Sequence, residues 1–117
     1  MPWYLTIRSD PTYSRSTHTE PLVGYILSSL ELVQTGPQEF RNAPTSPWVV
    51  LVMATADETG CYAVNTLAQP TANVVELICG DGDESWYESL AIKVASFLSW
   101  EAVDEHEERV IRSAEET

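Results

Sequence analysis

An unbroken apolar run, WVVLVMA at residues 48–54, limits the possible folds of this chain more than any other segment. The run contains three valines and no polar side chain, a pattern typical of a central strand that is covered on both faces. Pro44 and Pro47 argue against regular structure just before it. We therefore expect a sheet built around residues 48–54, with apolar side chains supplied on both of its sides.

Two further segments have the alternation of strands with one buried face. They are residues 2–9, PWYLTIRS, and residues 73–80, NVVELICG, in which Glu76 lies opposite the apolar face. The sequence DETG predicts a tight turn after the apolar run, and CYAVNT at residues 61–66 predicts the returning strand of a hairpin. A short strand over residues 32–34 is an open alternative before a Gly-Pro turn signal.

Two segments have helical periodicity. The first follows Pro21, and either Thr17 or Thr19 could cap it, with Glu20 at capping-box spacing from Thr17. The second runs from Asp83 to Trp100 and predicts the best helix in the chain. Its apolar stripe consists of Trp86, Tyr87, Leu90, Ala91, Val94, Phe97 and Leu98.

Residues 101–112 fit two interpretations. They could continue the helix, or they could form one or two edge strands in which charged residues discourage unwanted pairing. We favour strands, because small α+β domains often add a strand after a helix, and we expect residues 113–117 to be a frayed tail.

These elements predict a single α+β domain over residues 1–112, with a mainly antiparallel sheet and two helices packed on one face. A ferredoxin-like or related two-layer sandwich is the leading architecture. The pattern leaves the strand order open. We expect most aromatic residues to lie in the core, including Trp3 and Trp48 at strand starts and Trp86 and Trp100 at helix ends. Cys61 and Cys79 are expected to be buried, reduced thiols.

The charge is strongly negative: 18 acidic residues stand against six basic ones, for a net charge of −12. Residues 59–117 carry twelve of the acids and three of the bases. Such a field repels nucleic acid and anionic membranes and accelerates encounter with a basic protein. The sequence contains neither an 18-residue apolar run nor an export signal, so we expect a cytoplasmic protein.

No metal-binding pattern is complete. The two histidines, His18 and His106, are far apart and the chain has no CxxC. A calcium loop beginning at Asp81 would have Trp86 where a glycine is needed and Ile92 where a bidentate glutamate is needed. We therefore expect no metal and no cofactor, and we interpret the acids before the second helix as its cap.

Catalytic motifs are also missing. The sequence has no GxSxG, no phosphate-binding glycine loop, and no histidine close to a cysteine. We therefore predict no catalytic residue and no enzymatic activity. Acids and aromatic residues instead suggest a surface that binds a cognate basic protein. The residues assigned to this surface are Asp81, Asp83, Glu84, Trp86, Tyr87, Glu88, Glu101, Asp104 and Glu105.

The chain resembles the small acidic immunity proteins that bacteria encode beside polymorphic toxins. The resemblance is one of type: a single α+β domain, a net charge of −12, no catalytic motif, and the charged segment SWEAVDEHEERVIR after the last helix. It implies a cytoplasmic protein that binds a cognate toxin domain and blocks its active site.

Two alternatives remain open. One is a small enzyme or ligand-binding domain with a pocket between sheet and helices, for instance around Tyr62, Asn65 or His106. The other is a structural or regulatory subunit that associates with itself, for example through a sheet edge. The oligomeric state is left open by the sequence.

Overall fold

The computed structural model describes residues 3–62, 69–105 and 107–114. The helices are α1 (Thr19–Ser29) and α2 (Glu84–Leu98). The strands are β1 (Trp3–Arg8), β2 (Thr17–His18), β3 (Leu32–Gly36), β4 (Glu39–Asn42), β5 (Val49–Ala54), β6 (Thr71–Ala72), β7 (Val74–Cys79), β8 (Glu101–Asp104) and β9 (Arg109–Arg112).

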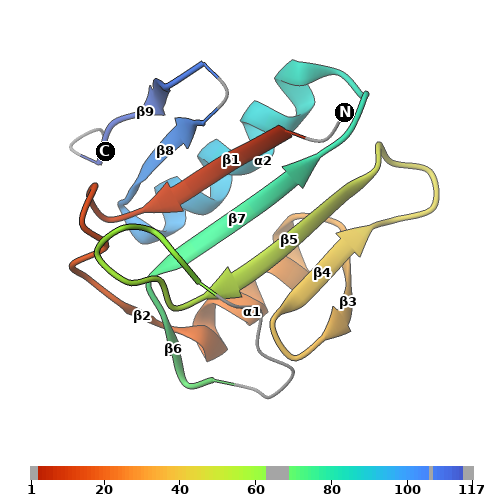
Figure 1. Ribbon diagram of the computed structural model, residues 1–117. Helices are drawn as coiled ribbons and strands as arrows, with labels where there is room; N and C mark the ends of the chain where they lie inside the picture. The colour runs from red at the N-terminus through yellow and green to blue at the C-terminus, as the bar shows by residue number, and fades with distance from the viewer. Residues whose placement is uncertain (1–2, 63–68, 106, 115–117) are drawn as a thin grey trace.

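Seven of these strands form one sheet in the order β3-β4-β5-β7-β1-β8-β9, and all neighbouring strands in it are antiparallel. Strands β2 and β6 pair separately. Both helices lie behind the sheet in Figure 1, so the fold has two layers. The predicted α+β class, with an antiparallel sheet and two helices on one face, is confirmed.

The inner elements follow the chain order β1-α1-β5-β7-α2-β8, which is the βαββαβ arrangement of ferredoxin-like domains. The β3–β4 hairpin extends the sheet beyond β5, and β9 extends it beyond β8. The prediction of strands over residues 101–112 is therefore confirmed. The C-terminal residues 115–117 of the expected tail lie outside the described residues.

The apolar run contains β5, in the middle of one half of the sheet, and all six residues of this strand are buried. A row of large side chains crosses four strands on the face toward the helices, because Leu51 pairs with both Phe40 and Leu77, and Leu77 pairs with Leu5. The alternate residues point to the open face, the side of the sheet without helices. After β5, residues 55–62 fold back across this open face, where Ala56 and Tyr62 pack near Val74.

The predicted hairpin after β5 is wrong in its pairing. The turn forms, with the Gly60 amide donating to the Asp57 carbonyl at 2.9 Å. However, β5 pairs with β4 and β7 instead of with the following segment. Cys61 is exposed outside any strand, contrary to the expected burial, and residues 63–66 lie outside the described part of the chain.

Helix α2 begins as predicted. Asp83 is its N-cap and accepts a hydrogen bond from the Ser85 amide at 3.0 Å. The capping box of α1 is wrong: its N-cap is His18, which makes no side-chain cap hydrogen bond. The cause is tertiary, because Thr17 is paired in the β2–β6 ladder and the Thr19 hydroxyl donates to the Gln69 carbonyl at 2.6 Å.

Two aromatic residues expected in the core are at the surface. Phe97, near the end of α2, is 44% exposed and stacks on Tyr25 of α1 at a ring-centroid distance of 4.3 Å. Trp48, immediately before β5, is 48% exposed. The core side of α2 is filled by smaller residues and by Tyr87, which is completely buried.

Candidate functional site

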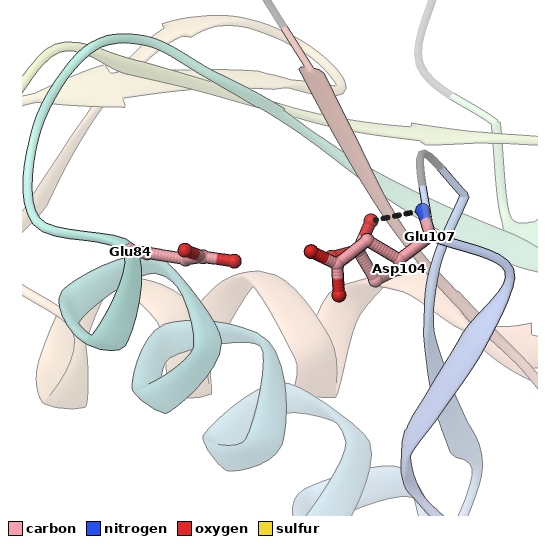
Figure 2. A group of neighbouring side chains, drawn as sticks. All are labelled: Glu84, Asp104 and Glu107. Carbon is pink, nitrogen blue, oxygen red and sulfur yellow. Dashed lines mark hydrogen bonds between the residues drawn. The ribbon is translucent and has the colours of Figure 1, made fainter.

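Three carboxylates from separate segments meet where the first turn of α2 faces the β8–β9 hairpin. Glu84 belongs to α2, Asp104 ends β8, and Glu107 lies in the hairpin turn. One carboxylate oxygen of each lies within 4.8 Å of the others. Figure 2 shows Glu84 pointing from the helix toward the other two, with the Glu107 amide donating to Asp104 Oδ1 at 3.3 Å. We call these three residues the acidic triad.

Sheet register and helix capping bring the triad together. Asp104 pairs with Leu5, whose side chain is in the core under the helices, so Asp104 lies on the same face of the sheet as α2. It is only 2% exposed, whereas Glu84 and Glu107 are both exposed. The Asp83 cap fixes the first turn of α2 and thereby the position of Glu84.

Arg109 connects the triad to the next turn of the helix. Its Nη2 lies 2.9 Å from Glu88 Oε2 and 4.0 Å from Asp104 Oδ2, while its Nε lies 3.2 Å from Glu107 Oε2. Hydrogen bonds to Glu88 and Glu107 raise the pKa of the guanidinium. The guanidinium contacts three carboxylates, and Glu84 lies beside two of them, so this surface keeps an excess of negative charge. Carboxylate oxygens are also ligands for hard cations, and the prediction that the chain binds no metal stays a prediction.

Only some of the residues predicted to form the partner-binding surface lie close together. Glu84, Glu88 and Asp104 meet in the Arg109 network. Asp81 and Asp83 are exposed in the segment leading into α2, and Trp86 is half-buried beside it.

Tyr87 does not belong to this surface, and its assignment was wrong. It is fully buried, and its hydroxyl donates to the Trp48 carbonyl at 2.6 Å. The rings of Trp3 and Trp86 pack edge-on against it at centroid distances of 5.5 and 5.1 Å. Position 87 faces the sheet, so the aromatic ring there is part of the core.

Glu101 and Glu105 lie on the open face and not beside the triad, because they alternate with Ala102 and Asp104 along the chain. Glu101 Oε2 accepts a hydrogen bond from Arg8 Nε at 2.6 Å. Glu105 follows β8, and its amide donates to the Tyr4 carbonyl at 3.3 Å. The predicted surface is thus divided between the two sides of the sheet.

The open face holds a second group of ionisable residues around Glu76. This residue is 5% exposed in the middle of β7, and Thr6 Oγ1 donates to its Oε2 at 2.8 Å. Burial raises the pKa of Glu76 to about 9, and a hydrogen bond with Glu105 and the charge of Glu105 act in the same direction. Glu76 is therefore protonated at neutral pH and bonded to a second carboxyl group.

Tyr62 lies close to this pair. Burial, together with electrostatic interactions with Glu76 and Glu105, raises the pKa of its hydroxyl above the ordinary range. Tyr62 also lines a shallow cavity of about 490 Å³ with Thr55, Ala56, Asp57 and Cys61. Asn65 and His106, the other residues predicted to line a pocket, lie outside the described residues.

Sequence reasoning missed Glu107, Arg109 and the role of Glu76. Only the turn between β8 and β9 places Glu107 and Arg109 against α2, and the sequence did not indicate that turn. Glu76 did carry a signal: it is a single acid inside the apolar strand VVELIC, where a charged side chain has few ways to reach water.

Fold and surface define the protein as a two-layer α+β domain whose helix side carries an acidic, arginine-bridged patch. Comparison with protein-family models, with curated proteins and with solved structures finds no match to this chain. Across the residues described, neither helix is both long and apolar enough to cross a membrane.

Proposed function

We propose that this is a non-enzymatic binding protein that neutralises a cognate basic protein, most concretely an immunity protein that protects the cytoplasm by blocking the active site of a toxin domain. The observation that carries the proposal is the acidic triad, in which the exposed Glu84 and Glu107 gather at the buried Asp104 from three separate segments. The net charge of −12 gives this surface a long-range attraction for a basic partner.

The Arg109 network supports binding because it holds charged groups in place before a partner arrives. The guanidinium is bonded to Glu88 and Glu107, so these carboxylates lose less side-chain freedom on binding. Charges at an interface mainly raise the association rate and select the right partner. An acidic surface of this kind would complement the basic substrate-binding cleft of a toxin.

The direct test is rescue of growth. The protein is co-expressed with the product of the neighbouring gene, and restored growth together with a one-to-one complex is the expected result. The association rate should fall as salt is added. Growth arrest that persists with every adjacent gene product, with no complex formed, would contradict the proposal.

Charge variants sharpen this test. The double variant E84Q/E107Q removes two exposed charges from the triad, and we expect it to slow association about fivefold at low salt. The matched control E20Q/E58Q removes two exposed charges from α1 and from the turn after β5, and it should change the rate less. Equal effects of both pairs would assign the attraction to net charge and not to the triad.

A second candidate function is binding or conversion of a small molecule on the open face. It is favoured by the hydrogen-bonded carboxyl pair of Glu76 and Glu105 next to the Tyr62 cavity, since paired carboxyl groups can exchange protons with a ligand. A fragment screen by NMR tests it, and binding that shifts the Tyr62 ring signals would support it. A screen in which no fragment shifts these signals would remove it.

A further inference from the structure

Trp48 is an exposed aromatic ring on a firmly held backbone. Its side chain is 48% exposed, whereas Trp100 is 4% exposed. Its carbonyl accepts the 2.6 Å hydrogen bond from the buried Tyr87 hydroxyl, and β5 begins at the next residue. Because the backbone of this exposed ring is already fixed, binding through it would cost little further conformational entropy.

Two glycines allow the acidic segment before α2 to pack closely against Trp48 and Pro47. A Cβ on Gly80 would lie 3.1 Å from Trp48 Cε3, and a Cβ on Gly82 would lie 2.8 Å from Pro47 Cβ. A side chain at position 82 would force Pro47 or the segment to shift, and one at position 80 would require the Trp48 ring to move by a few tenths of an ångström. The glycines therefore keep Asp81, between them, close to the tryptophan. The Trp3 indole nitrogen holds the same segment from the sheet side by donating to the Gly80 carbonyl at 3.0 Å.

The segment that packs on this ring carries negative charges. Asp81 and Asp83 are exposed in the segment that packs on it, and the next residue is Glu84 of the acidic triad. An indole face attracts a guanidinium within about 6 Å of the ring centroid, and carboxylates beside it bind the same group through charged hydrogen bonds.

Another exposed aromatic side chain, near the end of α2, differs in both respects. Phe97 already stacks on Tyr25, and the residue one helical turn before it is Lys93, a base. A cation would meet an occupied ring face and a like charge there. Phe97 therefore serves as the comparison for Trp48.

We propose that Trp48, with Asp81 and Asp83, is the contact point for an arginine-rich segment of the basic partner. The existence of a basic partner rests on the proposed function, and this inference adds Trp48 as the residue that anchors the interface. The occupant is argued from charge complementarity: an aromatic face bordered by carboxylates fits a planar cation better than a neutral or acidic chain.

The test uses a hexa-arginine peptide as the probe, titrated into the ¹⁵N-labelled protein at low salt. We expect the largest shifts at the Trp48 indole N–H and at the amides of Gly80 and Gly82. Trp48→Leu should weaken hexa-arginine binding about threefold or more, and it should weaken hexa-lysine binding less, because arginine stacks on aromatic rings more effectively. Phe97→Ala is the matched control and should leave both affinities unchanged.

A charge variant completes the design. D81N/D83S removes both carboxylates, while the serine introduced at position 83 can still cap α2, and the variant should weaken binding of both peptides. The inference is overturned if hexa-arginine does not bind, if the shifts centre away from Trp48, or if Trp48→Leu and Phe97→Ala bind equally well. Growth rescue is scored separately, so a failed peptide titration removes this anchor while a failed rescue removes the proposed function.

Discussion

Replacing Glu76 with glutamine should make the protein more stable at neutral pH, because the buried carboxyl group must take up a proton when the chain folds. Burial raises the pKa of Glu76 to about 9, against an ordinary value of 4.5. Glutamine has nearly the same shape and needs no proton. Its carbonyl can accept the hydrogen bond from Thr6, and its amide can donate to Glu105.

The sign and size follow from proton linkage. Between pH 4.5 and about 9 the folded state holds a proton that the unfolded chain has lost, so the free energy of unfolding falls as the pH rises. Each pKa unit corresponds to about 1.4 kcal/mol, so the wild type loses about 3 kcal/mol between pH 4.5 and 7, and at most about 6 kcal/mol by pH 9. The glutamine variant avoids this loss.

Urea unfolding followed by tryptophan fluorescence at a series of pH values measures the effect. The wild type should lose stability steadily from acid to alkaline pH, while Glu76→Gln should show a much flatter profile and exceed the wild type by about 2–3 kcal/mol at pH 7. Glu58→Gln, in the exposed turn after β5, is the control and should follow the wild-type profile. A glutamine variant that is less stable than the wild type at pH 7, with an unchanged pH slope, would refute the reasoning.

Three further predictions concern the core and the helix cap. Asp83→Ala should cost about 1 kcal/mol in urea unfolding, because the α2 cap is lost, while Asp83→Ser should retain most of the stability; equal losses would show that charge and not capping matters. Tyr87→Phe should cost about 1–2 kcal/mol in the same assay, because the Trp48 carbonyl loses its donor; an unchanged midpoint would contradict this. Iodoacetamide should alkylate exposed Cys61 in the folded protein but spare Cys79, since burial and the charges of Asp104 and Glu76 raise the pKa of that thiol to about 12. Mass spectrometry distinguishes the two, and modification of Cys79 without urea would be the contrary result.

The sequence predicted those parts of the fold that local periodicity determines. The apolar run 48–54 contains the buried strand β5, and alternation placed Val75, Leu77 and Cys79 together on the helix-covered face of β7. The 3.6-residue period and the acid before it located α2 and its cap. These features depend on residues a few positions apart, which a sequence displays directly.

Features that depend on distant pairing were missed. The turn after residue 54 suggested a hairpin, yet β5 finds its partners in β4 and β7, which are distant in the sequence or precede the turn. Tyr87 was assigned to the surface and is buried, whereas Trp48 was expected in the core and is exposed. The hydrogen bond from the Tyr87 hydroxyl to the Trp48 carbonyl joins two segments that are distant in the sequence, so local periodicity could not indicate it. Packing across the sheet decides which of two aromatic rings is covered.

Composition predicted some residues of the candidate site, but the register of the strands determines which of them lie together. Charge density alone selected Glu84 and Asp104, but their proximity depends on the pairing of Leu5 with Asp104. The same alternation sends Glu101 and Glu105 to the opposite face, beside Arg8 and Glu76. The predicted surface therefore contained two members of the triad, lacked Glu107, and did not separate the two groups into which the sheet divides its acids.

The position of β1 between β7 and β8 has a consequence for synthesis on the ribosome. Leu5 leaves the ribosome early, but its partners Leu77 and Asp104 follow much later in the chain. Strand β1 waits with both edges unpaired until β7 has emerged, and its second edge stays unpaired until β8, which follows α2, has emerged as well. Such long-range closure slows folding and exposes strand edges to other nascent chains. Emergence of the segment that follows α2, and not the appearance of the first helix, should mark the onset of a protected sheet.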